Sequence, residues 1–329
     1  MSEYVVCVRN KKTKNREKVF GNEPGPTLFL KVPGDQYPKP SQAISRRDWV
    51  SEVIAEAKTG INEITGQPTG DILVFIHGYN NSQEIVLKRH RKLESDLKNV
   101  GYKGAVISYD WPSAQSGLNY LEDRDDAKDT ARRLRDDCIS LFSSRQLAGC
   151  EINVHLLGHS TGAYVIRHAF TDADEKTSIK NRPWTVSQIA FIGGDISSRS
   201  MSVNDTKSKS LYRHCVRLTN YQNPYDSVLK LSNTKRIGLS PRVGRVGLPD
   251  DAHKKAINLN CGPYFKRLDE DALSQGVDYY GSFPHSWHIG DETFAQDLAL
   301  TIAGNIDRHK IPTRIVEDGE LVLNYKGLP

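Results

Sequence analysis

The sequence predicts an α/β protein built on a doubly wound, mostly parallel sheet that is flanked by helices. Between residues 71 and 304, short unbroken apolar runs alternate with helical patterns. Unbroken apolar strands are typical of a parallel sheet whose two faces are both covered by helices. Two β-branched runs near the N-terminus, residues 4–8 and 27–32, predict antiparallel strands at one edge of that sheet.

The first 70 residues are expected to form these two strands and one helix. The densest basic stretch, residues 9–18, lies between the strands and is interpreted as a solvated loop. Aromatic residues are not interleaved with its cations, so no nucleic-acid partner is expected. Residues 45–58 predict a helix, which Ser45 would cap and Gly60 would end.

The alternating region, residues 71–304, is expected to be the core of one domain that spans residues 1–329. Residues 305–329 are interpreted as a C-terminal tail. The predicted strands of the core are residues 72–76, 105–107, 154–157, 189–192, 215–218 and 256–259. The clearest predicted helices are residues 83–100, 121–143, 163–171 and 293–304.

Two polar stretches interrupt this alternation, residues 171–184 and 232–255. Loops of this length are unusual without a role, so each is a candidate for a lid or substrate loop. A plain surface excursion is the alternative for both. The second stretch contains Arg242 and Arg245, which hint at an anionic substrate.

Composition and motifs exclude several classes of function. The hydrophobic fraction of 37% and the net charge of +5 are those of a mildly basic globular chain, not of a disordered one. The five cysteines are odd in number and widely spaced, which predicts reduced thiols. No GxxxxGK[ST], GxGxxG, CxxC or HExxH motif is present, so no metal or other cofactor is expected. No signal-peptide pattern and no membrane-spanning apolar stretch is found, which predicts a cytoplasmic protein.

The most specific motif is Gly-His-Ser-Thr-Gly at residues 158–162, directly after the strand at 154–157 and directly before a helix. This strand–GxSxG–helix arrangement resembles the nucleophile elbow of the α/β-hydrolase fold. Side chains at Gly158 and Gly162 would clash with neighbouring backbone in so tight a turn. The turn lifts the Ser160 hydroxyl clear of the sheet, and the following helix directs its positive dipole end at a developing oxyanion. Ser160 is therefore the predicted nucleophile.

An oxyanion hole requires two backbone N–H groups. One is expected from Thr161, the residue after the nucleophile. The second is expected from Tyr79, in the loop that follows the strand at 72–76, where Gly78 permits close approach of the backbone. His77 in this loop is expected to hold the loop by hydrogen bonds and not to act as a base.

The catalytic base is expected to be a histidine that follows the acid, because the order in this fold is serine, acid, histidine. Of the ten histidines, His285 and His288 lie in the segment between the last strand and the last helix. We prefer His285, since Pro284 stiffens the backbone just before it. His288 is the alternative.

The catalytic acid is expected at the end of a strand between Ser160 and His285. Asp226 follows the strand at 215–218 and has room for a strand–helix unit on each side. It would orient the imidazole and stabilise its protonated form. Asp226 also stands where it could cap a helix, and both roles can hold together. Asp195, one strand earlier, is the reserve.

Together these motifs resemble the α/β-hydrolase superfamily of the serine esterase and lipase type, over about residues 71–304. The sequences at residues 77–81, 111–113, 158–162, 223–226 and 285–287 resemble a bacterial branch that is catalogued as a domain of unknown function. The resemblance implies a triad of Ser160, Asp226 and His285. It implies nothing about the substrate. We expect His77, Gly78, Trp111 and His159 to line the substrate pocket. Trp111 and Tyr79 are expected to line its acyl or alcohol part, with packing aromatics as the alternative for both.

The expected activity is hydrolysis of a small-molecule carboxylic ester through an acyl-enzyme intermediate. The same constellation performs thioester and amide hydrolysis and acyl transfer, which remain alternatives. A non-catalytic binding protein on a hydrolase scaffold is the alternative from another class, and the joint presence of serine, histidine and acid argues against it.

Overall fold

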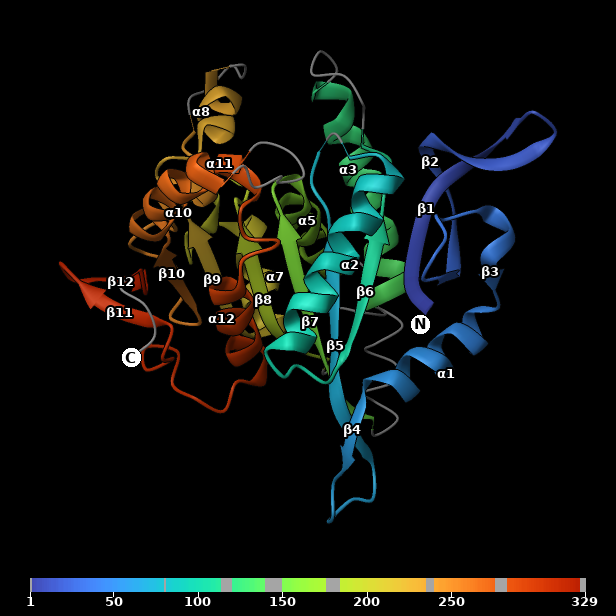
Figure 1. Cartoon of the computed structure of the whole chain (residues 1–329), viewed down its shortest axis with the longest axis horizontal. Helices are drawn as coiled ribbons and strands as arrows, with labels where there is room; N and C mark the ends of the chain where they lie inside the picture. The colour runs from blue at the N-terminus through green and yellow to red at the C-terminus, as the bar shows by residue number, and fades with distance from the viewer. Residues whose placement is uncertain are drawn as a thin grey trace.

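The computed structural model describes residues 2–79, 81–113, 120–139, 150–175, 184–234, 240–275 and 283–325. Within them, one 12-stranded sheet runs through the molecule in the order β11-β12-β10-β9-β8-β7-β5-β6-β1-β2-β3, with β4 paired to β5 (Figure 1). The strands are β1 (Ser2–Lys14), β2 (Glu17–Pro33), β3 (Ala43–Ile44), β4 (Lys58–Ile61), β5 (Pro68–Ile76), β6 (Ala105–Asp110), β7 (Glu151–His159), β8 (Val186–Ile192), β9 (Cys215–Gln222), β10 (Ala256–Asn260), β11 (Arg314–Glu317) and β12 (Glu320–Leu323).

The central strands are parallel, from β12 through β10, β9, β8, β7, β5 and β6 to β1. Antiparallel pairs occur at the two edges and where β4 meets β5. The predicted fold class is therefore confirmed, including the antiparallel N-terminal strands. Because the parallel strands all point the same way, their carboxyl ends meet at one edge of the sheet, which is uppermost in Figure 1.

Helices cover both faces of the sheet, which buries the apolar strands on both sides. One buried cluster lies under α1, α3, α5 and α7 and includes Trp49, Phe170 and Leu211. A second lies under α2, α10 and α12 and includes Leu93 and Phe294, and a smaller third includes Val5, Leu30 and Leu87. The helical elements are η1 (Pro40–Gln42), α1 (Arg46–Ala57), α2 (Gln83–Asn99), α3 (Tyr120–Arg133), the π-helical turn η2 (Leu134–Ile139), α5 (Thr161–Glu175), η3 (Ser198–Met201), α7 (Thr206–His214), α8 (Ser227–Thr234), α9 (Val243–Val246), α10 (Gly262–Gln275), α11 (Phe283–Ser286) and α12 (Glu292–Ala303).

The predicted helices match closely where they can be compared. Ser45 caps α1 by accepting a hydrogen bond from the Asp48 N–H, as expected. The helix predicted at residues 121–143 is divided into α3 and the π-helical turn η2, and its last four residues lie outside the described residues. No helix among the described residues combines the length and the apolar character that crossing a membrane would require.

The interpretation of residues 9–18 as a loop is wrong. β1 continues to Lys14 and pairs with β2 as a long antiparallel hairpin, whose turn places Asn15 and Arg16 at positive φ. Backbone pairing between the strands needs no apolar side chains, so hydropathy gives no sign of it. Within this stretch Arg9 is buried, and its Nε lies 2.8 Å from Oδ1 of Asp110 on the neighbouring strand β6.

Residues 305–329, interpreted as a tail, contribute the strands β11 and β12 to the sheet. A buried ion pair joins this segment to α12: Nη2 of Arg314 lies 2.6 Å from Oδ1 of Asp297, and neither side chain is exposed. The same carboxylate accepts hydrogen bonds from the hydroxyls of Tyr221 and Thr313. The C-terminal segment is thus part of the folded core.

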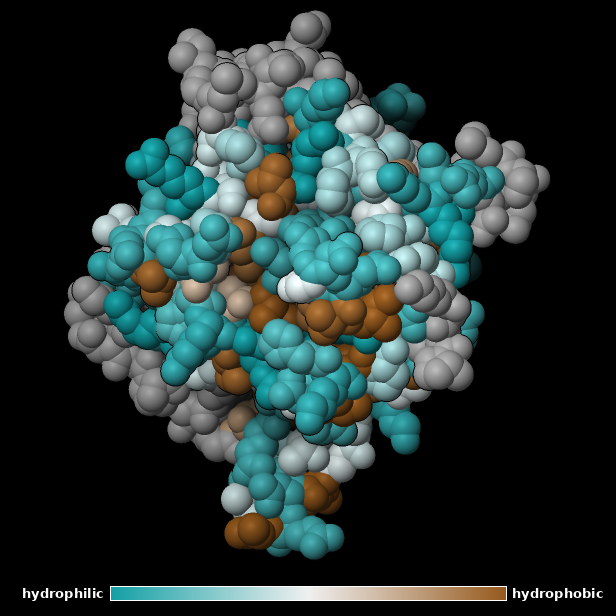
Figure 2. Space-filling model, turned by 90° about the vertical axis from the view of Figure 1, so that its left-hand side faces the viewer, coloured by the Kyte–Doolittle hydropathy of each residue, from teal (hydrophilic) through white to brown (hydrophobic). Residues whose placement is uncertain are grey.

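The surface seen from the β11 side mixes hydrophobic and hydrophilic side chains (Figure 2). The β4–β5 hairpin projects away from the carboxyl edge of the sheet, at the bottom of Figures 1 and 2. Its residues Ile61 and Ile64 are 57% and 95% exposed. All five cysteines are free, as predicted, and four of them are buried.

Candidate active site

Ser160 occupies the sharp turn between β7 and α5, at the carboxyl edge of the sheet. Its φ angle is +56°, in the left-handed region that a residue with a side chain rarely adopts. Backbone hydrogen bonds hold this conformation: the Ser160 N–H donates to the Ile192 carbonyl (3.0 Å), and the Ser160 carbonyl accepts from the Asp195 N–H (3.0 Å). The strained serine at a strand–helix turn has the backbone geometry of a nucleophile elbow.

Three glycines allow the surrounding backbone to approach this turn. A β-carbon at Gly158 would lie 2.8 Å from the Ala163 Cα, and one at Gly162 would lie 2.1 Å from the Ile76 carbonyl oxygen. A β-carbon at Gly78 would lie 2.6 Å from the Ser160 Cβ. The β5–α2 loop therefore passes directly beside Ser160.

His285 and Asp226 are in direct contact. The His285 Nδ1–H donates to Oδ2 of Asp226 at 2.6 Å, and both residues are buried. The second carboxylate oxygen, Oδ1, accepts the Leu229 N–H at 2.9 Å and so caps α8. Asp226 therefore caps α8 with one carboxylate oxygen while the other is bonded to His285. This tautomer leaves the lone pair of His285 Nε2 available to accept a proton.

His285 lies against the two strand ends that frame Ser160. A β-carbon at Gly193, which follows β8, would lie 3.0 Å from Cε1 of His285. His159, which precedes the serine, donates from Nε2 to the His285 carbonyl at 3.0 Å, and the two imidazole rings are 4.9 Å apart. Burial, followed by the nearby His285, lowers the pKa of His159 well below its usual range, so this ring stays neutral.

The reserve candidates have other surroundings. Nε of Arg242 lies 3.1 Å from Oδ1 of Asp195, and both side chains are buried. His288 stacks on Trp287 with ring centroids 4.1 Å apart, and neither of its ring nitrogens has a hydrogen-bond partner in the described part of the chain. Burial, with His285 nearby, lowers the pKa of His288 well below its usual range.

Two fully buried residues, His77 and Trp111, hold the β5–α2 loop by hydrogen bonds. His77 donates from Nδ1 to the Gly78 carbonyl (2.8 Å) and accepts the Trp111 N–H at Nε2 (3.1 Å). The Trp111 indole N–H donates back to the His77 carbonyl at 2.8 Å. Burial lowers the pKa of His77, which keeps it neutral. His77 thus holds the loop as expected, and these contacts favour packing over lining a pocket for Trp111.

No role was predicted from the sequence for several buried polar residues of this region. Asn81 donates to the carbonyls of Gly78 (2.8 Å) and Tyr79 (2.9 Å). Arg89 of α2 and Arg9 of β1 both bond to Asn81. Nothing in the sequence around Arg9 indicates that it is buried. Arg89, in contrast, interrupts the apolar face of α2, and this pattern indicates a buried charged side chain.

The hint of an anionic substrate from Arg242 and Arg245 is not supported. Arg242 pairs with Asp195, and Arg245 donates to the Asp226 carbonyl at 2.9 Å. Backbone hydrogen bonds also fasten Gly244 between the ends of β8 and β9. Residues 242–245 are therefore bonded to the strand ends of the sheet. Residues 176–183 and 235–239 lie outside the described residues.

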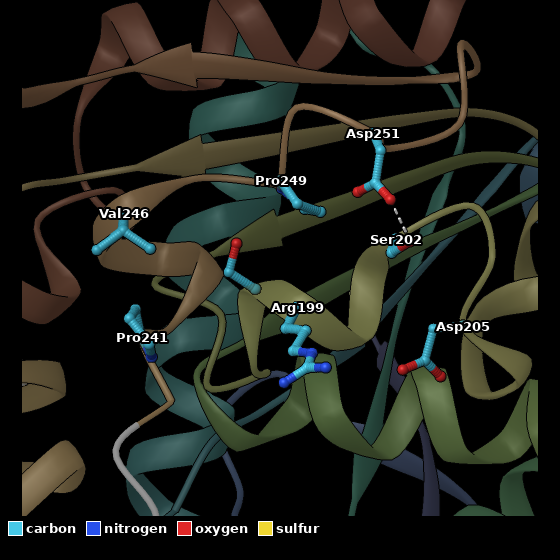
Figure 3. Close-up of a pocket in the computed structure, with 8 residues that line it drawn as sticks. Arg199, Ser202, Asp205, Pro241, Val246, Pro249 and Asp251 are labelled. Atoms are coloured by element: carbon cyan, nitrogen blue, oxygen red, sulfur yellow. Dashed lines mark hydrogen bonds between the residues drawn. The ribbon is translucent and has the colours of Figure 1, made fainter.

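A pocket of about 550 Å³ opens beside this segment (Figure 3). Pro241, Val246 and Pro249 form its apolar wall. Arg199 of η3 and Asp205, the N-cap of α7, also line it. The Ser202 hydroxyl donates to Asp251 at 2.5 Å across one side. Its lining includes none of the candidate site residues.

The sheet order, the helices on both faces and the serine at the strand–helix turn define an α/β hydrolase. A family model described as "alpha/beta hydrolase of unknown function (DUF900)" matches residues 54–262, more than half of the chain. The chain belongs to this family. No curated protein matches it at a significant level.

Solved structures of hydrolases are similar at low identity. A cutinase from Trichoderma reesei is 13% identical, with a TM-score of 0.32, over 78% of this chain and 83% of that one. A lipase-esterase related protein from Clostridium acetobutylicum is 11% identical, with a TM-score of 0.33, over 72% and 94%. A cutinase-like protein from Cryptococcus sp. is 16% identical, with a TM-score of 0.31, over 75% and 97%. Likenesses at these TM-scores support no inference about activity.

Proposed function

We propose that this α/β hydrolase is a serine hydrolase that cleaves carboxylic esters through an acyl-enzyme intermediate. Ser160 is the nucleophile, His285 the base and Asp226 the acid. The observation that carries the proposal is the 2.6 Å contact between His285 and Asp226, both buried and at the same sheet edge as the strained Ser160. A carboxylate on Nδ1 sets the tautomer that a serine–histidine pair requires.

Acylation begins when Ser160 Oγ attacks the ester carbonyl and His285 Nε2 takes the hydroxyl proton. The negative charge that develops on the carbonyl oxygen is stabilised by the N–H groups of Thr161 and Tyr79. Thr161 opens α5, so its N–H belongs to a helical turn whose amides have no intrahelical acceptor. His285 then gives the proton to the leaving alkoxide as the tetrahedral intermediate collapses, which releases an alcohol.

Deacylation repeats these steps with water. His285 takes a proton from water, whose oxygen attacks the acyl carbon, and the proton returns to Ser160 Oγ as the carboxylic acid leaves. Asp226 stabilises the imidazolium in both halves. His77 and Trp111 hold the β5–α2 loop in place, and His159 lies beside the imidazole of His285 as a neutral ring.

The test is covalent labelling with a fluorophosphonate probe, combined with hydrolysis of a series of p-nitrophenyl esters. Wild type should be labelled and active, and Ser160→Ala should lose both properties. His285→Ala and Asp226→Ala should be labelled much more slowly. A folded wild-type protein with no labelling beyond that of Ser160→Ala would overturn the proposal.

The reserve residues supply matched controls for the assignment of acid and base. Asp195→Asn and His288→Gln should keep more labelling than Asp226→Asn and His285→Gln. The reason is that Asp195 is paired with Arg242 and His288 stacks on Trp287, whereas Asp226 and His285 bond to each other. If Asp195→Asn or His288→Gln loses more labelling than its counterpart, the role of acid or base belongs to Asp195 or His288. A thioester substrate in the same series separates esterase from thioesterase activity.

A further inference from the structure

Arg89 joins the two halves of the proposed catalytic site. It lies in the second turn of α2 and is 5% exposed. Its Nη1 donates to Oδ1 of Asn81 at 2.9 Å, and its Nη2 donates to Oγ of Ser286 at 3.2 Å. These partners belong to the β5–α2 loop and to α11, which are far apart in the sequence.

The Asn81 end controls the orientation of the loop peptide that carries the Tyr79 N–H. Asn81 donates its side-chain amide to the carbonyls of Gly78 and Tyr79. In a trans peptide the C=O and N–H point in opposite directions. With the Gly78 carbonyl bonded to Asn81 and His77, the Tyr79 N–H points in the opposite direction, away from these two side chains.

The Ser286 end controls the position of the base. Ser286 follows His285 directly in α11, so a bond to its hydroxyl restrains the backbone from which the imidazole projects. On the other side of His285, Pro284 is held by the Asn223 side chain, which donates to its carbonyl at 3.1 Å. The Arg89 bond therefore completes the support of α11 from the side of the β5–α2 loop.

Burial of a guanidinium is costly, and here burial lowers the pKa of Arg89 to about 10, so it still carries its charge at neutral pH. A planar fork with fixed angles can hold two acceptors in one relative position, whereas a lysine ammonium on a flexible stem cannot. We propose that Arg89 is a positioning residue that fixes the Tyr79 N–H and His285 relative to each other. The proposal rests on the proposed function, because it assumes that these two groups act in one reaction.

The kinetic test compares Arg89→Lys with Arg91→Lys, an equal change on the same helix. Arg91 is partly buried and pairs with Glu3 of β1, outside the proposed catalytic site. Arg89→Lys should lower kcat on a p-nitrophenyl ester by about 10- to 100-fold, with KM changed by less than about threefold, since transition-state alignment is lost and not substrate binding. Arg91→Lys should stay within about twofold of wild type.

A second variant tests whether Arg89 acts on kcat through its hydrogen bond to Ser286. Ser286→Ala removes one end of the bridge and should lower kcat less than Arg89→Lys. The double variant should be no slower than Arg89→Lys alone, because interacting residues are not additive. Additive losses would show that Arg89 does not act through Ser286 and would overturn the coupling.

Hydrogen exchange gives a readout that does not depend on activity. In Arg89→Lys, peptides from the β5–α2 loop and from residues 283–290 should both exchange faster, and in Arg91→Lys neither should. If Ser160 is labelled in wild type but Arg89→Lys keeps the wild-type kcat, the positioning role is refuted and the proposed function stands. If Ser160 is not labelled in wild type, the proposed function fails. Separately, if only one of the two peptides, or neither, exchanges faster in Arg89→Lys, the positioning role of Arg89 is refuted.

Discussion

Replacing Gly78 with alanine would place a methyl group against the proposed nucleophile. The new Cβ would lie 2.6 Å from the Ser160 Cβ and 2.9 Å from the His159 carbonyl oxygen, whereas ordinary contacts begin at 3.4 Å. Ser160 and the β5–α2 loop must therefore separate by about 0.8 Å. Gly78 is not among the residues with positive φ, so the methyl group and not backbone strain causes the effect.

A displacement of about 1 Å in a catalytic site can cost about 100-fold in rate, which corresponds to roughly 2.7 kcal/mol in the activation free energy. We expect kcat/KM for Gly78→Ala to fall by about this factor on a p-nitrophenyl ester. Overpacking costs about 1–3 kcal/mol in the free energy of unfolding, which a domain of this size should survive. Thermal unfolding should therefore still show a cooperative transition.

The matched control is Gly60→Ala, in the β4–β5 hairpin away from the carboxyl edge. Its Cβ would lie 3.1 Å from Oγ1 of Thr69, a side chain that can rotate away. This variant should keep the wild-type kcat/KM. A folded Gly78→Ala protein within about threefold of wild type would refute the close approach of the loop to Ser160 as a requirement for catalysis.

Three further predictions concern buried carboxylates. Asp226→Asn should lower kcat by about 10⁴-fold, because an amide no longer holds the required His285 tautomer, and a loss below tenfold in steady-state assays would contradict this. Asp297→Ala should lower the free energy of unfolding by about 3–5 kcal/mol, because Arg314 stays buried without its carboxylate, and a denaturant titration that shows less than 1 kcal/mol would contradict this. Burial raises the pKa of Asp291 to about 6, which is above the pKa of this group in the unfolded chain. The contribution of Asp291 to the free energy of unfolding is therefore present below about pH 4 and is lost as the pH rises through about 6. Asp291→Asn should therefore gain stability relative to wild type by up to roughly 3 kcal/mol between pH 4 and 7, whereas a pH-independent difference in thermal unfolding would contradict the assignment.

The turn at Ser160 and the parallel strands could be predicted because each depends on residues that are adjacent in the sequence. Five consecutive residues around Ser160, with a strand before and a helix after, predict the tight turn, and in the structure Ser160 lies in such a turn with a φ of +56°. The apolar runs likewise predicted the parallel strands, since burial on both faces leaves a continuous signal. Elements without such a signal were missed or misread: the polar hairpin around residues 9–18, and β11 and β12, which are four residues each.

The sequence by itself determined the fold class, the turn that presents Ser160 and a short set of candidates for the acid and the base. Only the tertiary structure decided that Asp226 meets His285 while Asp195 meets Arg242, because these pairs join separate strand ends whose spacing in space is not encoded in chain order. The same holds for Arg89, which contacts a serine 197 residues away. Chain order restricts which residues can act together, but the packing of parallel strands and their helices determines which of them meet.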